Sequence, residues 1–330
     1  MISIYGTFGP ACGSRETMEA MFRAGMTGMR LNLSHTGLAH SGERIAAFHA
    51  AAAAAGVQPE LLIDMQGPEL RVGVLEETLE LTDHSEVTLG KGGIPVPAET
   101  LPVMYPGDEV VLDDGKISLR ILESLGDHVT ARVARGGRLS SRKSIKLKNP
   151  NAVVDMPVLT AHDLANVALA AEYGVTGLMQ PFVRSGEDLR RVRQALEEHG
   201  AQQVKIYAKI ENMEGVENLE DILPEADWII IARGDLGNDM DLWQLPGVQK
   251  RIAAAWGAHN TPFGVVPQML ASMEHSPGPT RAEVSDIFNA VLDGAAGVMV
   301  TGETAVGKFP VEAITYLSKT AAAAEDWLQA

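Results

Sequence analysis

The sequence predicts an α/β protein: one (β/α)8 TIM barrel with a small β-barrel lid domain inserted after the third strand. Eight short apolar runs alternate with amphipathic, helix-like segments along the chain of 330 residues. Buried parallel strands read as near-continuous apolar runs, and their alternation with helices implies a parallel sheet. One long interval, between Met65 and Thr160, lacks this alternation of strands and helices. An open doubly wound sheet is the alternative, but eight regular repeats favour a closed barrel.

The barrel elements can be placed in order along the chain. Strands are expected at residues 3–8, 28–33, 61–65, 177–182, 205–210, 228–232, 263–267 and 297–301. Helices are expected at residues 15–24, 40–55, 161–173, 187–199, 249–259 and 282–293. The segment 311–330 is expected to be the eighth barrel helix, which would leave no room for a further domain.

The interval between Met65 and Thr160 lacks a long helical pattern. It contains strand-like pieces at residues 78–81, 86–89, 109–112, 117–122 and 128–133, which are separated by Gly and Pro. We therefore expect an inserted β-domain at residues 72–153 and a barrel made of residues 1–71 and 154–330. An insertion after a barrel strand lies at the face where barrel active sites are found, so it is a candidate lid.

Composition excludes several classes of function. The formal net charge of −16 argues against binding to nucleic acid or to anionic membranes, although a few local cations can still hold a phosphate. The single cysteine, Cys12, excludes an intrachain disulfide and favours a cytoplasmic location. No apolar run reaches the length of about 20 residues that spans a bilayer, and the N-terminus does not resemble a signal peptide.

Charged residues gather at the ends of the fifth and sixth strands. Lys209 and Glu211 are two positions apart, so they point to the same side of their strand. Asp235 is expected to face the same mouth of the barrel, and the backbone of Gly234 lets a ligand approach closely. Two carboxylates from adjacent strands suit Mg²⁺ or Mn²⁺. A structural ion pair is the alternative explanation for Lys209 and Glu211.

Three further strand ends carry polar side chains. Arg30, Asn32 and Ser34 alternate onto one face after the second strand, Asp64 ends the third, and Glu303 follows the eighth. A guanidinium suits bidentate binding of phosphate or carboxylate. Because all these groups lie at carboxyl ends of strands, together they predict a site for a divalent metal and a phosphate.

Together with several other short segments, these strand ends resemble the motifs of the pyruvate kinase family. The matching segments are residues 7–11 (TFGPA), 30–35 (RLNLSH), 67–71 (GPELR), 113–115 (DDG), 209–212 (KIEN), 232–237 (ARGDLG), 279–283 (PTRAE) and 302–304 (GET). They occur in the family's order and cover essentially the whole chain. The resemblance implies transfer of a phosphoryl group between phosphoenolpyruvate, or a related enol or small acid, and ADP or ATP.

The resemblance also implies roles at the metal and phosphate end. Lys209 would stabilise the transferring phosphoryl group and the enolate, and Arg30 would contact the phosphate. Glu211 and Asp235 would bind Mg²⁺ or Mn²⁺, and the amides of Gly234 and Asp235 would hold the substrate carboxylate. Glu303 is a third candidate catalytic residue.

A monovalent-cation site and a nucleotide site are implied as well. The residues expected to hold K⁺ are Asn32, Ser34, Asp64 and the carbonyl of Met65. The residues expected to contact nucleotide are Pro10, His35, Arg71 and, on the edge of the insertion, Asp114. A lid lysine is also expected, and Lys143, Lys146 and Lys148 are the candidates.

The sequence departs from the family in three places. Pro267 stands where the family has a threonine associated with the substrate carboxylate and with protonation of the enolate. Pro181 stands where the family usually has a small polar residue. Neutral drift is one explanation, but both positions belong to the half of the site that would hold the organic acid. We therefore expect a pocket reshaped for a different small acid. The family's C-terminal regulatory domain is expected to be absent.

Two other functions compete with the kinase hypothesis. A divalent-metal-dependent pyruvate or enolate lyase, or an aldolase, would use the same barrel without nucleotide. A non-catalytic binding protein would have little need of Lys209, Glu211 and Asp235 together.

A homodimer through the helices after strands six and seven, including Trp243, Pro246 and Trp256, is also expected by analogy with the family. Ordinary helix packing is equally consistent with these residues.

Overall fold

A computed structural model describes the chain except for residues 1, 35, 114, 150–153, 155 and 330. The chain divides into two compact units. The barrel unit contains Met1–Gly67 and Val158–Ala330, and the inserted unit contains Pro68–Pro157. The insertion expected at residues 72–153 lies inside the second unit. Among the described residues, no helix is both long and apolar enough to cross a membrane.

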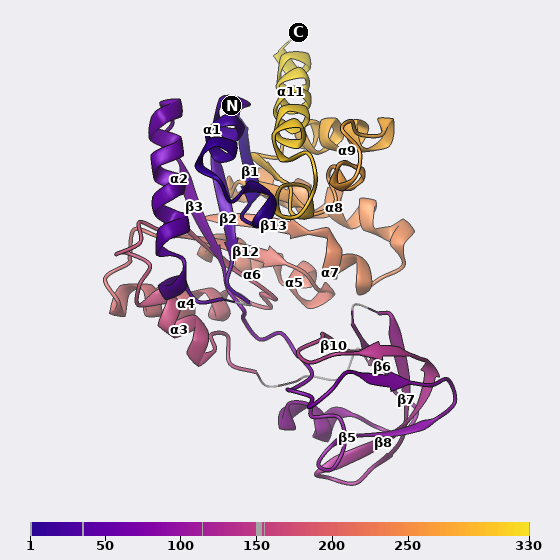
Figure 1. The fold of residues 1–330 in the computed structure, drawn as a ribbon. Helices are drawn as coiled ribbons and strands as arrows, with labels where there is room; N and C mark the ends of the chain where they lie inside the picture. The colour runs from indigo at the N-terminus through magenta and orange to yellow at the C-terminus, as the bar shows by residue number, and fades with distance from the viewer. Residues whose placement is uncertain (1, 35, 114, 150–153, 155, 330) are drawn as a thin grey trace. The chain divides into compact units, whose positions relative to one another are not determined.

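The barrel unit is a closed ring of eight parallel strands, as predicted (Figure 1). The order around the ring is β1-β15-β14-β13-β12-β11-β3-β2, so strands that follow one another in this unit are neighbours. The strands are β1 (Ser3–Thr7), β2 (Gly28–Asn32), β3 (Glu60–Asp64), β11 (Gly177–Gln180), β12 (Lys205–Ile210), β13 (Trp228–Ala232), β14 (Phe263–Val266) and β15 (Gly297–Met299).

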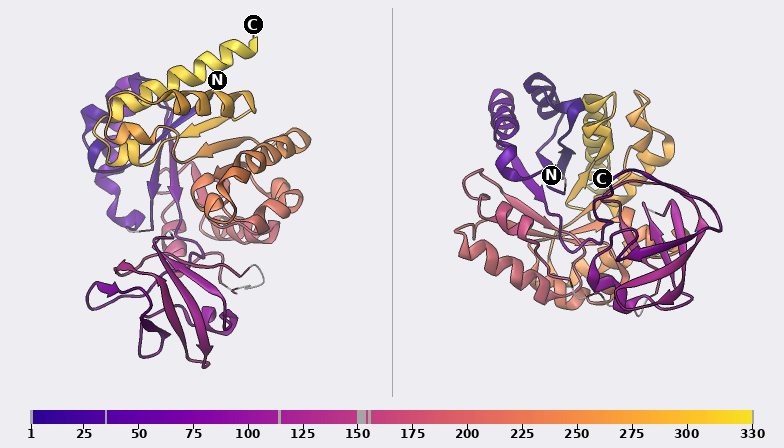
Figure 2. Two further views of the ribbon diagram at one scale, coloured as in Figure 1. Left: turned by 90° about the vertical axis from the view of Figure 1, so that its right-hand side faces the viewer. Right: turned by 60° about the horizontal axis from the view of Figure 1, so that its bottom comes forward.

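Helices surround the outside of this ring (Figures 1 and 2). The α-helices are α1 (Arg15–Arg23), α2 (Gly42–Ala55), α3 (Ala161–Val167), α4 (Gly186–Glu198), α5 (Met213–Glu217), α6 (Leu219–Ile222), α7 (Arg233–Asn238), α8 (Leu245–His259), α9 (Arg281–Leu292), α10 (Gly302–Ala305) and α11 (Pro310–Gln329). The 3-10 helices of this unit are η1 (Pro10–Cys12), η2 (Leu38–His40), η4 (Leu223–Glu225), η5 (Leu242–Gln244) and η6 (Ala271–Glu274). The helix expected over residues 161–173 is α-helical only as far as Val167, and turns follow it.

Two apolar layers hold the barrel unit together. The larger lies between strands and helices and includes Met29, Leu61, Ile206 and Leu317, all fully buried or nearly so. The smaller fills the ring itself and includes Tyr5 and Tyr207. Such burial stabilises by about 25 cal/mol for each Å² of apolar surface removed from water. The strand ends are therefore fixed on both sides, which gives the polar groups at those ends a rigid base.

The inserted unit contains antiparallel strands in two groups. A five-stranded sheet has the order β10-β6-β7-β8-β5, and β4 pairs with β9 alone. The elements are β4 (Leu79–Leu81), β5 (Glu86–Gly90), η3 (Ala98–Val103), β6 (Glu109–Leu112), β7 (Ile117–Ser124), β8 (His128–Arg135), β9 (Gly137–Leu139) and β10 (Ile145–Leu147). The sequence led us to expect a small barrel, whereas the described strands form these two sheets around an apolar core of their own.

Strands β9 and β10 were not expected from the sequence. Each has only three residues, and each contains one long basic side chain, Arg138 or Lys146. Three residues are too few to display the alternation of apolar and polar side chains that marks a strand. Their pairing with β4 and β6 is therefore visible only in the folded chain.

Candidate active site

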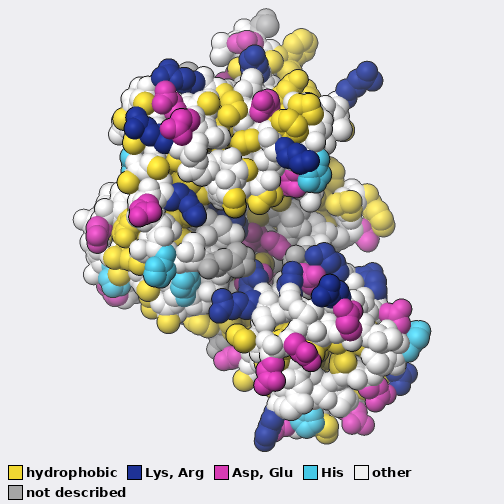
Figure 3. Space-filling view, in the orientation of Figure 1, with side chains coloured by type: hydrophobic (Ala, Val, Ile, Leu, Met, Phe, Trp, Pro, Cys, Tyr) yellow, Lys and Arg dark blue, Asp and Glu magenta, His cyan; other side chains and the backbone are white. Residues whose placement is uncertain are grey.

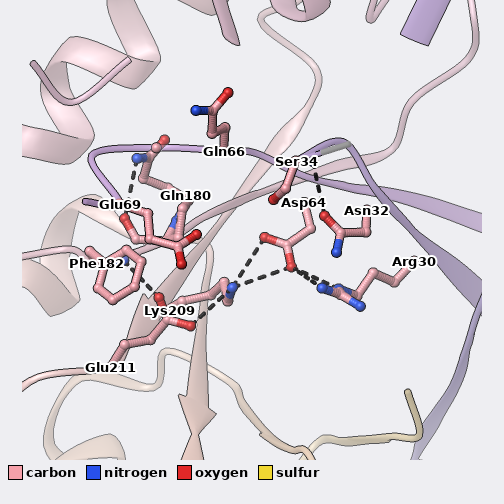
Figure 4. A network of polar contacts seen from close by, with 12 residues as sticks. Arg30, Asn32, Ser34, Asp64, Gln66, Glu69, Gln180, Phe182, Lys209 and Glu211 are labelled. Carbon is pink, nitrogen blue, oxygen red and sulfur yellow. Dashed lines mark hydrogen bonds and ion pairs between the residues drawn. The ribbon is translucent and has the colours of Figure 1, made fainter. Parts of the chain in front are cut away.

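The carboxyl ends of β2, β3 and β12 bring four charged side chains together. Asn32 is opposite Asp64 in the register of β2 and β3, so alternation turns Arg30 and Asp64 toward the same interior. Lys209 and Glu211 enter from the end of β12, two strands away from β3 around the ring. The sequence predicted all four as site residues, and the structure places them in one network (Figure 4).

Asp64 lies at the centre of this network. Its Oδ2 atom accepts hydrogen bonds from Arg30 Nε at 2.7 Å and Nη2 at 2.6 Å. Lys209 Nζ lies 3.2 Å from both oxygens of Asp64 and 3.0 Å from Glu211 Oε1 (Figure 4). The side chains of Asp64 and Glu211 are only 3% and 2% exposed. Two cations and two carboxylates thus compensate one another in a nearly dry environment.

Burial and charge set the protonation state of each group. Burial alone would lower the pKa of Lys209, but the carboxylates of Asp64 and Glu211 outweigh it and raise that pKa. Burial would raise the pKa of Asp64, but Lys209 and Arg30 hold it below its usual value. Burial, with help from Asp235 and Asp64, raises the pKa of Glu211 against the opposing charge of Lys209. The raised pKa favours the protonated, positively charged form of Lys209.

Glu211 and Asp235 form the donor pair expected for a divalent metal. Glu211 Oε2 accepts a hydrogen bond from the Phe182 amide at 2.9 Å, which fixes the carboxylate. Asp235 lies in the first turn of α7 and is close enough to raise the pKa of Glu211. Among the described residues, no three His, Cys, Asp or Glu side chains cluster as a metal site. Two carboxylates fit Mg²⁺, which commonly completes its shell with water and substrate oxygens.

The residues expected to hold a monovalent cation also gather. The side chains of Asn32, Ser34 and Asp64 lie close together (Figure 4). Asn32 Oδ1 accepts a hydrogen bond from the Ser34 amide at 3.0 Å, which closes a tight turn after β2. An amide oxygen, a hydroxyl and one carboxylate are hard oxygen donors, so their chemistry fits a monovalent cation. Met65 follows Asp64 directly, and its amide bonds Met179 O on β11 at 3.1 Å.

The carboxylate of Glu303 bonds backbone amides of two loops and not the charged network described above. Its side chain is buried, Oε1 accepts a hydrogen bond from the Leu270 amide at 3.0 Å, and Oε2 accepts one from the Thr301 amide at 2.7 Å. These bonds join the loop after β14 to the end of β15. Its predicted catalytic role therefore stays a prediction, while its observed contacts are those of a residue that holds two loops.

The predicted nucleotide contacts lie in several places. Pro10 begins η1 and is exposed. Arg71, in the inserted unit, donates to Glu69 Oε2 and to Arg142 O, at 2.7 Å for the latter. His35 and Asp114 lie outside the described residues, so their positions stay predictions.

The two prolines that replace polar residues differ in what they contact. A β-carbon built on Gly67 would overlap the Pro181 ring, and Gly67 has φ of +60°, so this glycine is required by both conformation and space. A β-carbon built on Gly234 would lie 3.4 Å from Pro267 Cγ. Pro181 therefore packs against the loop after β3, and Pro267 packs against the glycine whose amide is expected to bind the substrate carboxylate.

The sequence reasoning gave no role to several residues that organise the site. Arg233 pairs with Asp286 on α9 at 2.7 Å and donates to Pro267 O at 3.0 Å. Polar side chains of α3 bond the loops after β2 and β3. The signal for the second group was present, since Thr160 and Asp163 have the spacing of a helix capping box. No sequence signal identified the loops that this helix contacts.

The fold and the site define a (β/α)8-barrel protein with a charged, metal-compatible centre at the carboxyl ends of its strands. The family model described as "Pyruvate kinase, barrel domain" matches residues 1–314. The chain is 35% identical to the pyruvate kinase of Geobacillus stearothermophilus over 98% of its own length and 57% of that relative. It is 34% identical to the pyruvate kinase of Clostridium acetobutylicum, covering 69% of it, and 36% identical to that of Aeropyrum pernix, also covering 69%.

The chain therefore belongs to the pyruvate kinase family. It spans a little over half the length of the first of these relatives.

Proposed function

We propose that the chain is a phosphotransferase of the pyruvate kinase type. It would move a phosphoryl group between phosphoenolpyruvate, or a related enol or small acid, and ADP or ATP, with Mg²⁺ or Mn²⁺ and K⁺. The observation that carries this proposal is the buried Lys209, which lies between Asp64 and Glu211 with Arg30 bonded to the same aspartate. A phosphoryl group that enters this network meets two fixed positive charges.

The geometry suits phosphoryl transfer because this reaction needs positioning and charge neutralisation more than covalent chemistry. Lys209 keeps its proton, so it can neutralise charge on a transferring phosphoryl group or on an enolate. Asp64 accepts from two of the five N–H donors of Arg30, which leaves donors for phosphate oxygens. Glu211 and Asp235 would hold the divalent ion, which would supply further positive charge to the phosphate.

The acid half of the pocket supports a substrate other than pyruvate or phosphoenolpyruvate itself. The Pro267 ring lies beside Gly234, and proline offers neither the hydroxyl nor the amide proton that a polar residue would bring there. Pro181, in contrast, is in contact with Gly67, which supports a structural explanation for that replacement. We therefore assign the altered specificity to Pro267.

Basic side chains of the inserted unit offer a surface for nucleotide phosphates. Figure 3 shows Lys and Arg side chains gathered on part of this unit. Lys143 Nζ lies 2.7 Å and Lys116 Nζ 3.1 Å from the carboxylate of Asp113, while Arg71 bonds the carbonyl of Arg142. Hydrogen bonds from these two lysines hold the pKa of Asp113 below its usual value, although burial opposes them. The lysines are thereby held at Asp113, which directly precedes the predicted nucleotide contact Asp114 in the sequence.

A homodimer remains part of the proposal. Leu242 and Trp243 of η5 are 70% and 78% exposed, and Pro246 at the start of α8 is exposed as well. Large apolar side chains beside one another on a surface are typical of protein contacts. The side chain of Trp256 lies outside the described residues.

The experiment that tests the proposed function measures pyruvate formation from phosphoenolpyruvate and ADP with Mg²⁺ and K⁺, beside a Lys209→Met control. A ³¹P NMR screen of ATP against 2-oxo, 2-hydroxy and phosphonate acids then identifies other acceptors. We expect a phosphorylated product that Lys209→Met does not form. If neither assay shows turnover above this control, the phosphotransferase proposal is wrong. Thermal stabilisation by ADP or ATP would in addition argue against the lyase or aldolase alternative.

A further inference from the structure

Helix α3 carries a carboxylate, that of Asp163, which accepts hydrogen bonds from three backbone amides. Asp163 is fully buried. Its Oδ2 atom accepts hydrogen bonds from Thr160 N at 2.9 Å and Thr160 Oγ1 at 2.8 Å. The first of these forms a capping box at the start of the helix together with the bond that Thr160 Oγ1 accepts from Asp163 N at 3.1 Å. Oδ2 also accepts from Gly67 N at 3.0 Å, and Oδ1 accepts from Gln66 N at 2.8 Å. The bonds from Gln66 and Gly67 are not part of a capping box, so they have a further role, which is to fix the loop after β3.

Two other side chains of α3 hold the loop after β2. His162 Nε2 lies 2.8 Å from the carbonyl oxygen of Leu33. Asn166 Oδ1 accepts a hydrogen bond from the Leu38 amide at 2.8 Å, and Asn166 is 2% exposed. A single short helix thus bonds the backbone at both ends of the segment 33–38.

The two loops are those that carry the expected monovalent-cation ligands. Asn32 and Ser34 lie at the start of one loop, and Asp64 and Met65 lie at the start of the other. The Leu33 amide also bonds Asp64 O at 2.9 Å, so the loops are adjacent at their bases. Farther along each loop, side chains of α3 form hydrogen bonds with the loop backbone.

We propose that His162, Asp163 and Asn166 are positioning residues, here named the α3 clamp, that hold the two halves of the monovalent-cation site at the separation the cation needs. None of the three is itself a ligand. The proposal rests on the proposed function, because it assumes the cation site described there. Its consequence is that binding of K⁺ and the integrity of the α3 contacts are coupled, although the clamp lies outside the ring of strands.

The test measures thermal unfolding as K⁺ replaces tetramethylammonium at constant ionic strength. A cation that binds only the folded state raises the Tm, and the K⁺ concentration at half of this rise reports its affinity. We expect the midpoint concentration to increase at least about tenfold in Asp163→Asn and in Asn166→Leu, which remove acceptors for different loops. Asn166→Leu keeps the test possible if Asp163→Asn does not fold.

Glu283→Gln provides the matched control. Glu283 forms the same kind of capping box with Thr280 on α9, but it bonds Ser272, which belongs to neither cation loop. We expect this variant to lower the Tm in the absence of K⁺ without moving the midpoint. If wild-type protein gains no stability from K⁺, the cation site and the clamp both fail. If wild type is stabilised and the two clamp variants keep its midpoint, the cation site stands and the clamp is wrong.

Discussion

The two ends of the barrel bury polar groups in opposite ways. At the amino end, Tyr5 donates a 2.6 Å hydrogen bond to Glu60, and Tyr207 stacks on Trp228 with ring centroids 5.3 Å apart. Burial raises the pKa of both tyrosines, so their hydroxyls stay neutral. At the carboxyl end, Asp64 and Lys209 keep their charges beside Arg30 and Glu211, although the side chains of Asp64 and Glu211 are almost completely buried. The amino end is built for packing, whereas the carboxyl end maintains an electrostatic arrangement that packing does not require.

The largest expected effect comes from breaking the charge balance at the carboxyl end. Lys209→Met removes the cation between two buried carboxylates, so we expect activity to fall by about three orders of magnitude. The free energy of unfolding should fall by about 3–5 kcal/mol, because Glu211 is left without its partner. Denaturant unfolding and turnover assays measure the two effects separately.

The double variant Lys209→Met with Glu211→Leu sharpens this test. Apolar side chains of similar volume can replace a buried ion pair without loss of stability, so we expect the double variant to regain most of the lost free energy while remaining inactive. That outcome would show that the charges serve chemistry and not folding. A double variant as unstable as the single one would contradict it.

A substitution at the amino end of the barrel should lower the free energy of unfolding while leaving the catalytic rate nearly unchanged. Tyr207 is completely buried and contacts both Tyr5 and Trp228. Tyr207→Ala leaves a cavity in the centre of the ring, so we expect a loss of about 3 kcal/mol in the free energy of unfolding. The rate at saturating substrate should stay near that of wild type at temperatures well below the Tm. A fall in this rate as deep as that of Lys209→Met would remove the distinction between the two ends.

Sequence reasoning predicted the barrel and the charged network for a clear physical reason. Apolar runs and the two-residue alternation of strands are local patterns, so Lys209 and Glu211 could be assigned to one side of β12 before the fold was known. The contacts of α3 could not be predicted in this way, because Asp163 bonds a loop almost 100 residues away. The same limit applies to the two prolines. Both were assigned to the acid pocket, and only the fold shows that Pro181 contacts Gly67 while Pro267 contacts Gly234.

The smallest expected effect tests whether every carboxylate at the carboxyl end serves chemistry. Hydrogen bonds from Ser272 and Thr280 hold the pKa of Glu283 below its usual value, although burial opposes them. A lowered pKa in the folded state adds stability above the unfolded-state pKa of about 4.3, and this stability is lost as the pH falls through the folded-state value. We therefore expect Glu283→Gln to cost about 1 kcal/mol at pH 7. The difference in Tm between wild type and Glu283→Gln should become smaller below about pH 4. A difference that stays constant with pH, or a loss of turnover without a change in Tm, would place Glu283 with the catalytic groups instead of with the framework.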